Sequence, residues 1–175
     1  MIRSFDGKTP RIAESAFVSE AAYVIGDVEI GENSGVFPGA VIRGDFACIK
    51  IGRNTMVEDG SIVHSGSAVE IGDNCIIGHS VVMHGIKVGN NCLLGNNSTV
   101  LDNVKIGDHC IIAAGALVSP NAEVPDNSMV MGIPGVIKPM PPDRRPRRQS
   151  GQDGNRSYAD MLKRYKKQPE LGGKE

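Results

Sequence analysis

Aliphatic residues recur at every sixth position along most of the chain. One unbroken series runs from Ile12 to Ile42, and a second runs from Val88 to Val130. This period matches neither an α-helix, with 3.6 residues per turn, nor the two-residue alternation of a simple hairpin. It is typical of a parallel β-helix, in which three hexapeptides form one triangular coil. The pattern predicts an all-β solenoid of about seven coils over residues 12 to 135, with a core of aliphatic ladders.

Glycine often follows the aliphatic position, as in Ile30-Gly31 and Ile71-Gly72. A glycine there permits the corner turn that a side chain would obstruct. The chain has 22 glycines, 10 prolines and no tryptophan, which leaves Val and Ile to do most of the packing and favours short strands between frequent turns. The prolines near residues 131–135 are expected to prevent another ladder strand and so to close the solenoid.

The composition changes after the periodic region. We expect a solenoid domain over residues 1–137, an extended Pro-, Arg- and Gly-rich linker over 138–155, and a C-terminal helix and tail over 156–175. The helix is predicted at about residues 157–167, because four apolar side chains fall on one face at helical spacing. These are Tyr158, Met161, Leu162 and Tyr165. We expect this stripe to pack on the solenoid or on a neighbouring subunit.

Charge and composition argue against several kinds of partner. The formal net charge of −1 gives no general reason to expect nucleic acid or an acidic membrane surface. The basic run Arg144–Arg148 is interpreted as part of a solvated linker, since no aromatic platform accompanies it. No apolar run approaches the roughly 20 residues of a membrane span, and no signal sequence is recognisable, so we expect a cytoplasmic protein.

Three of the four cysteines recur in one context, after a glycine and two polar residues. They are Cys75, Cys92 and Cys110, and their spacing would stack them in consecutive coils. A column of thiols for a soft metal is conceivable. We interpret them instead as small buried hydrophobic residues, because free cysteine is among the most buried residue types.

The register of the repeat slips between residues 51 and 88, and His64, His79 and His84 all lie in this region. Solenoids often place such irregularities on a binding face. Three neutral imidazoles with no nearby thiolate suit a catalytic zinc or a similar divalent ion, because they leave one coordination position open. The alternative is that these histidines are solvated surface residues, which is how we interpret His109 in its turn.

His79 and His84 are five residues apart across a corner, in a fold whose faces turn every six residues. One chain would have difficulty directing both imidazoles at one ion. A neighbouring chain resolves the difficulty if His64 and His84 lie on adjacent coils of one subunit and His79 reaches across from the next. A closed ring of identical chains then makes equivalent sites, and a triangular prism favours a homotrimer.

Three motifs together resemble the γ-class carbonic anhydrase family. They are Arg43-Gly44-Asp45, the run from Glu58-Asp59 to His64, and Gly78-His79-xxxx-His84-Gly85. The resemblance implies a left-handed β-helix and a trimer with zinc, or iron or cobalt, between subunits. It further implies a lyase that hydrates carbon dioxide reversibly to bicarbonate by a metal-bound hydroxide.

By this resemblance the metal ligands are His64, His79 and His84. Arg43 and Asp59 form an ion pair across the subunit boundary, and Asp45 belongs to the same polar network. Tyr158 lies near the mouth of the pocket. Glu58 stands where the family usually has a glutamine that hydrogen-bonds the metal-bound water.

The chain also departs from the family pattern. Besides Glu58, it lacks the acidic loop with a proton-shuttle glutamate, because Phe46 follows Asp45 and the repeat resumes soon after His64. Two other functions therefore stay open. Hexapeptide solenoids often host acyltransferases that use coenzyme A and a histidine base. A scaffold subunit that binds metal without turnover is the third possibility.

Overall fold

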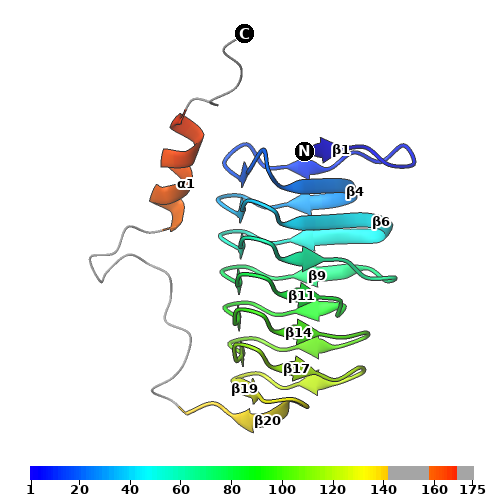
Figure 1. Ribbon diagram of the computed structural model, residues 1–175, viewed down its shortest axis with the longest axis vertical. Coiled ribbons are helices and arrows are strands. Elements are labelled where there is room, and N and C mark those ends of the chain that lie inside the picture. The colour runs from blue at the N-terminus through cyan, green and yellow to red at the C-terminus, as the bar shows by residue number, and fades with distance from the viewer. Residues whose placement is uncertain (142–157, 169–175) are drawn as a thin grey trace.

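The computed structural model describes residues 1–141 and 158–168, which form a left-handed parallel β-helix with one helix beside it (Figure 1). Seven parallel strands stack on one of its three faces, so the described part of the chain makes seven coils. Within that part, no helix is long and apolar enough to cross a membrane. The fold expected from the six-residue period is confirmed.

The first face carries mainly apolar residues on its outer side and is called the apolar face. Its strands are β1 (Ile2–Arg3), β8 (Ile62–Val63), β11 (Val82–Met83), β14 (Thr99–Val100) and β17 (Leu117–Val118), together with the first halves of β4 (Tyr23–Ile30) and β6 (Val41–Ile51). Ile62 and Val82 are 42% and 36% exposed there. This face presents a strip of apolar side chains to its surroundings.

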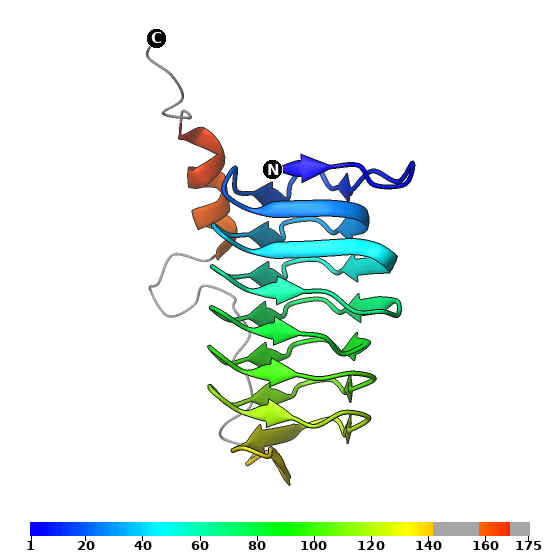
Figure 2. The ribbon, with the colours of Figure 1, turned by 45° about the vertical axis from the view of Figure 1, so that its right-hand side comes forward.

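The second face carries a charged residue at the outward position of each strand and is called the charged face. Its strands are β2 (Arg11–Ile12), β9 (Val69–Ile71), β12 (Lys87–Val88), β15 (Lys105–Ile106) and β18 (Glu123–Val124), with the second halves of β4 and β6. Because β4 and β6 pair with strands on both faces, they run continuously round the corner between them (Figure 2).

The third face is partly covered by the helix and is called the helix face. It consists of β3 (Phe17–Val18), β5 (Gly35–Val36), β7 (Met56–Val57), β10 (Ile76–Ile77), β13 (Leu93–Leu94), β16 (Ile111–Ile112), β19 (Ser128–Met131) and β20 (Val136–Pro139). As expected from the prolines near residues 131–135, no parallel strand follows β19 among the described residues, but pairing does not end there. The chain turns back through these residues, and β20 pairs antiparallel with β19. A hairpin accommodates Pro134 in its turn and Pro139 at the end of its strand, where neither interrupts the parallel ladder.

The core is a set of ladders in which one inward residue of each strand stacks on its equivalent in the next coil. On the apolar face these residues are Val24, Ile42, Val63, Met83, Val100 and Val118, none more than 1% exposed. Burying a side chain of this size contributes about 1.5–3 kcal/mol. The ladders hold successive coils in register, and therefore fix where each corner residue points.

The thiols of Cys75, Cys92 and Cys110 stack at one corner and are buried, as expected. Each donates a hydrogen bond to a carbonyl of the following coil, and Cys75 Sγ lies 3.0 Å from the carbonyl oxygen of Gly89. Thr55 occupies the same position one coil earlier and donates its hydroxyl in the same way. The column is therefore part of the core packing.

The helix α1 (Tyr158–Lys167) confirms the predicted element within one residue at its start. Its apolar stripe packs on the first coils of its own solenoid, where Leu162 is 2% exposed. The ring of Tyr165 lies 5.1 Å from that of Phe17 between centroids. Gly35 permits this approach, because a Cβ there would be 2.8 Å from Leu162 Cδ2. Of the expected linker, residues 142–155 lie outside the described part of the chain.

Candidate metal centre

Two of the candidate ligands lie side by side at the corner between the apolar and charged faces. Val63 pairs with both Ile42 and Met83, so the residues that follow these three are equivalent positions of consecutive coils. Those residues are Arg43, His64 and His84. The His64 and His84 rings have centroids 5.5 Å apart.

The same corner contains the irregularity seen in the sequence. Between matched positions, β4 has the single residue Asp27, whereas β6 has four residues, Asp45 to Cys48. The extra residues carry Asp45 and Phe46 outward beside His64. Phe46 is 72% exposed, and its ring centroid is 5.8 Å from that of His64. The slip in the repeat therefore does mark a feature of the surface.

Carboxylates accompany both histidines of this corner. His64 Nε2 lies 3.2 Å from Asp45 Oδ1, and Asp45 also forms an ion pair with Arg43. His84 Nδ1 lies 3.2 Å from Asp102 Oδ1. A carboxylate on Nδ1 selects the tautomer with hydrogen on that atom, which leaves Nε2 as the free ligand atom.

Local charges favour the neutral form of His64. Burial and the positive charge of Arg43 lower the pKa of His64, and the nearby Asp45 opposes this only in part. The pKa of Asp45 is held below its usual value against the effect of burial, chiefly by the hydrogen bond from Arg43. A neutral imidazole is the form that binds a metal ion.

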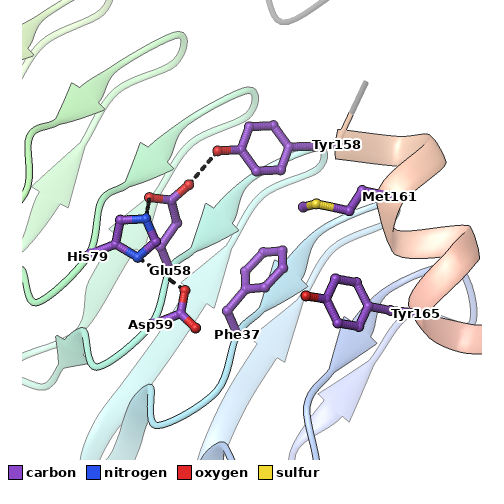
Figure 3. A pocket seen from close by; sticks show the side chains of 7 residues that line it. All are labelled: Phe37, Glu58, Asp59, His79, Tyr158, Met161 and Tyr165. Atoms are coloured by element: carbon purple, nitrogen blue, oxygen red, sulfur yellow. Dashed lines mark hydrogen bonds and ion pairs between the residues drawn. The ribbon is translucent and has the colours of Figure 1, made fainter. Parts of the chain in front are cut away.

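The remaining candidates lie at the other edge of the apolar face, at its corner with the helix face. His79 Nε2 is 3.2 Å from Glu58 Oε2, and His79 Nδ1 is 3.1 Å from Asp59 Oδ2. Tyr158 donates its hydroxyl hydrogen to Glu58 Oε1 from α1 (Figure 3). Burial, together with this bond to Glu58, raises the pKa of Tyr158, so its hydroxyl stays protonated as a donor.

A pocket of about 310 Å³ opens between this corner and α1. One side is polar and consists of the Glu58, Asp59, His79 and Tyr158 side chains. The other side is apolar, and in Figure 3 the Phe37, Met161 and Tyr165 side chains border the same space. The pocket thus combines a histidine and two carboxylates with an apolar wall.

The candidate residues therefore form two groups in one chain. Among the described residues, no three side chains of His, Cys, Asp or Glu converge so that they could hold a metal ion. All three histidines lie in the stretch 51–88 where the register slips, and within it His79 stands at a corner of regular spacing, between β10 and β11. Arg43 pairs with Asp45, and Asp59 pairs with His79. Among the described residues of one chain, Arg43 and Asp59 therefore do not form an ion pair with each other.

Two features of this region were not found from the sequence. Asp102 follows Leu101, which occupies the same column as His84 one coil on, but only the register of β11 and β14 reveals this. The apolar wall joins Phe37 to a helix more than a hundred residues away in sequence. By contrast, His109 is an exposed turn residue with φ of 56°, as interpreted.

Comparison with known proteins agrees with these motifs. A family model described as bacterial transferase hexapeptide (six repeats) matches residues 85–120. A protein named carbonic anhydrase from Geobacillus kaustophilus is 44% identical over 78% of this chain and 76% of its own length. Gamma carbonic anhydrase 1, mitochondrial, from Arabidopsis thaliana is 41% identical over 58% of this chain and 40% of its own length. The chain belongs to the γ-class carbonic anhydrase family.

A solved structure supports the fold over nearly the whole γ-class chain. The hexapeptide transferase family protein from Anaplasma phagocytophilum superposes with a TM-score of 0.78 at 28% identity, and covers 94% of this chain and 90% of that one.

Among the departures from the γ-class pattern, Glu58 has the most direct structural effect. A carboxylate can accept from Tyr158 but cannot donate, unlike the glutamine expected from the resemblance.

Proposed function

We propose that this protein is a metal-dependent carbonic anhydrase that hydrates carbon dioxide reversibly to bicarbonate. The proposal further places three equivalent sites at the subunit interfaces of a homotrimer. The observation that carries it is the position of the two groups, at opposite edges of one apolar face. His64 and His84 stand at one edge, and His79 stands at the other.

The arrangement restricts how copies can associate to complete a site. In a twofold interface every contact occurs twice, with residue i meeting residue j and residue j meeting residue i, so that two copies would form a closed dimer. A head-to-tail interface brings the His64 edge of one copy to the His79 edge of the next, and repeated contacts of this kind close into a ring. The apolar strip between the two edges supports such an interface, because burying it removes Ile62 and Val82 from water.

The donor set fits zinc or a similar divalent ion. Three imidazoles, two from one chain and one from its neighbour, match the ligand number of catalytic zinc sites. Asp59 and Asp102 on the Nδ1 atoms of His79 and His84 leave both Nε2 atoms available, provided that Glu58 releases His79 Nε2. When bound, such an ion supplies hydroxide from water at neutral pH. Iron and cobalt accept similar ligands.

The chain's own residues position the ligands and the substrate. Arg43 and Asp45 hold the ring of His64 and place a positive charge beside it, where it favours the bicarbonate product. In the assembled ring Arg43 also pairs with Asp59 of the neighbour, as the family pattern implies. Glu58 Oε2 lies 3.2 Å from His79 Nε2, and Tyr158 donates its hydroxyl hydrogen to the other oxygen of Glu58. The cytoplasmic location stays a prediction.

The decisive experiment combines metal analysis, mass in solution and stopped-flow hydration of carbon dioxide. Protein metallated anaerobically should contain about one ion per chain, migrate with three times the 18.6 kDa chain mass and hydrate carbon dioxide above the buffer rate. His79→Ala should abolish the rate, and His109→Ala should not change it, because His109 is an exposed turn residue.

Other outcomes identify the two alternatives. No rate above buffer with zinc, iron or cobalt would refute the catalytic proposal. Bound metal without turnover would indicate the inactive scaffold subunit. A thermal shift with coenzyme A that is unaffected by chelator would indicate the acyltransferase.

A further inference from the structure

We propose that Phe46 of one subunit inserts its ring into the pocket beside His79 of the neighbouring subunit. The inference rests on the proposed function, because it takes the shared site as its starting point. It goes beyond that site by assigning an occupant to the apolar half of the pocket. The occupant is a second copy of this chain.

Phe46 is the most exposed aromatic side chain among the described residues, at 72%. It stands on the four residues of β6 that project at the corner, where the matched part of β4 has only one. An exposed phenyl ring loses the free energy that burial would contribute. Among the described residues its one ring contact is with His64, at 5.8 Å between centroids.

The pocket offers a surface that suits a phenyl ring. Phe37 is 5% exposed and forms its floor, while Met161 and Tyr165 approach from α1 (Figure 3). Aromatic rings favour edge-to-face contacts with one another, and a methionine sulfur packs favourably against them. The volume of about 310 Å³ leaves room for the ring beside the polar wall.

Position within the site connects the two features. Phe46 adjoins His64 at one edge of the apolar face, and the pocket contains His79 at the other edge. A single chain holds them apart. If one ion binds both histidines at about 2.0–2.1 Å from each nitrogen, the neighbour's pocket must lie directly beside Phe46. The metal ligands and the aromatic contact then form from the same pair of edges.

Insertion has a consequence for the site itself. A phenyl ring between the two subunits excludes water from one side of the ligands and supplies an apolar wall where carbon dioxide, also apolar, can lie. Phe46 thereby occupies the place at which the resemblance would lead one to expect an acidic loop. In place of an acidic side chain that could carry protons to solvent, the protein then has an apolar contact between subunits.

Tryptophan fluorescence tests whether the ring is buried by assembly. The chain has no tryptophan, so Phe46→Trp introduces a single fluorophore. In the metal-loaded trimer its emission should shift to shorter wavelength, and acrylamide quenching should fall at least threefold relative to dissociated chains. The control is Val136→Trp, which is 54% exposed on β20 at the far end of the solenoid and should be quenched equally in both states.

Photo-cross-linking tests which surface receives the ring. Benzoylphenylalanine at position 46 reacts readily with methionine, so light-activated trimers mixed from ¹⁵N-labelled and unlabelled chains should yield cross-links to Met161 that join a light chain to a heavy one. The inference would be overturned if, in the metal-loaded trimer, acrylamide quenched a tryptophan at position 46 as strongly as in dissociated chains. It would also be overturned if position 46 cross-linked to its own chain or elsewhere on the partner. Either result would leave the shared site intact. A monomer that binds metal would overturn both.

Discussion

Asp102 lies one coil beyond His84, with its Oδ1 atom 3.2 Å from Nδ1 of the His84 ring. The carboxylate fixes the tautomer and the orientation of the imidazole. Removing such a partner typically weakens metal binding by about 10- to 100-fold. Asp102→Ala should therefore lower zinc affinity by that factor in a competition titration with a chelator.

The control for Asp102 is Glu123→Ala. Glu123 is also an exposed carboxylate, and it pairs with Lys105 on the charged face. Its removal should leave zinc affinity unchanged. Equal affinities for the Asp102 variant and the unmodified protein would show that His84 does not depend on this carboxylate.

Mixing variants distinguishes a shared site from one built within a chain. His79→Ala and His64→Ala chains should each bind zinc weakly alone, because two protein ligands remain where three are needed. Refolded together, they should recover part of the binding, since the intact His64 and His84 of one chain meet the intact His79 of the other.

A second mixture serves as the matched control. His64→Ala and His84→Ala chains each carry damage at the same edge, so no arrangement restores a complete set. That mixture should recover nothing. If the first mixture also recovers nothing while mixed trimers form, the three histidines do not combine across subunits.

Tyr158→Phe should destabilise the docking of α1. Glu58 is only 7% exposed and would lose its hydroxyl donor, leaving a buried carboxylate with His79 as its remaining partner. Leaving a buried polar group underbonded costs about 1–3 kcal/mol. Urea unfolding should show this loss, whereas Tyr165→Phe, at a 44% exposed position, should change stability by less than about 0.5 kcal/mol.

Gly52→Ala should destabilise the solenoid. A Cβ at Gly52 would lie 2.4 Å from Asp73 Oδ1 and 2.6 Å from the carbonyl carbon of Gly72, and backbone cannot move aside cheaply. We expect a loss of about 1–3 kcal/mol in the free energy of unfolding. Gly66→Ala is the comparison, because nothing lies within 4 Å of its Cβ position and stability should stay nearly constant. Equal effects would mean that the coils adjust their spacing.

Asp73 should contribute stability that disappears in acid. The hydrogen bond from the Arg53 backbone N–H, 2.7 Å long, together with the Arg53 guanidinium holds the pKa of Asp73 below its usual value against the effect of burial. The folded state therefore releases this proton more readily than the unfolded chain. The contribution is complete above the unfolded pKa near 4 and is lost as pH falls through the lower folded value.

Asp73→Asn tests this with little change of shape, since Asn90 accepts the equivalent backbone hydrogen bond one coil on. At pH 7 the variant should be less stable by on the order of 1 kcal/mol or less, because the pair is partly exposed to solvent. Near pH 2 the two proteins should unfold at the same urea concentration. A difference that persisted there would point to packing rather than charge.

The sequence determined most of the architecture, because a six-residue period with glycine corners is compatible with few folds. It also located α1 through the spacing of Tyr158, Met161 and Leu162. It did not reveal β20, since proline signals only that the parallel ladder cannot continue. An antiparallel return depends on the turn at residues 132–135, whose geometry is set by contacts such as that of Gly135 N–H with the Leu117 carbonyl.

The candidate site was less accessible to sequence reasoning. His64 and His84 could be placed together, because both follow an inward aliphatic residue in neighbouring coils. The five-residue spacing across a corner indicated that His79 points away from His84, but which corner holds His79 depends on the register of β10 and β11 with their neighbours. Pairings such as His84 with Asp102 depend on register between coils, and the exposure of Phe46 depends on the projection of β6.

The buried column of Cys75, Cys92 and Cys110 provides a set of internal probes for local opening of the solenoid. Each coil touches only its neighbours, so opening should begin at an end and progress inward. A thiol-alkylating reagent can reach these sulfurs only where the local coils have parted, whereas Cys48, which is half-buried, should react without such opening. The order in which the three cysteines are alkylated would then show, one coil at a time, how far local unfolding extends from the β19–β20 end.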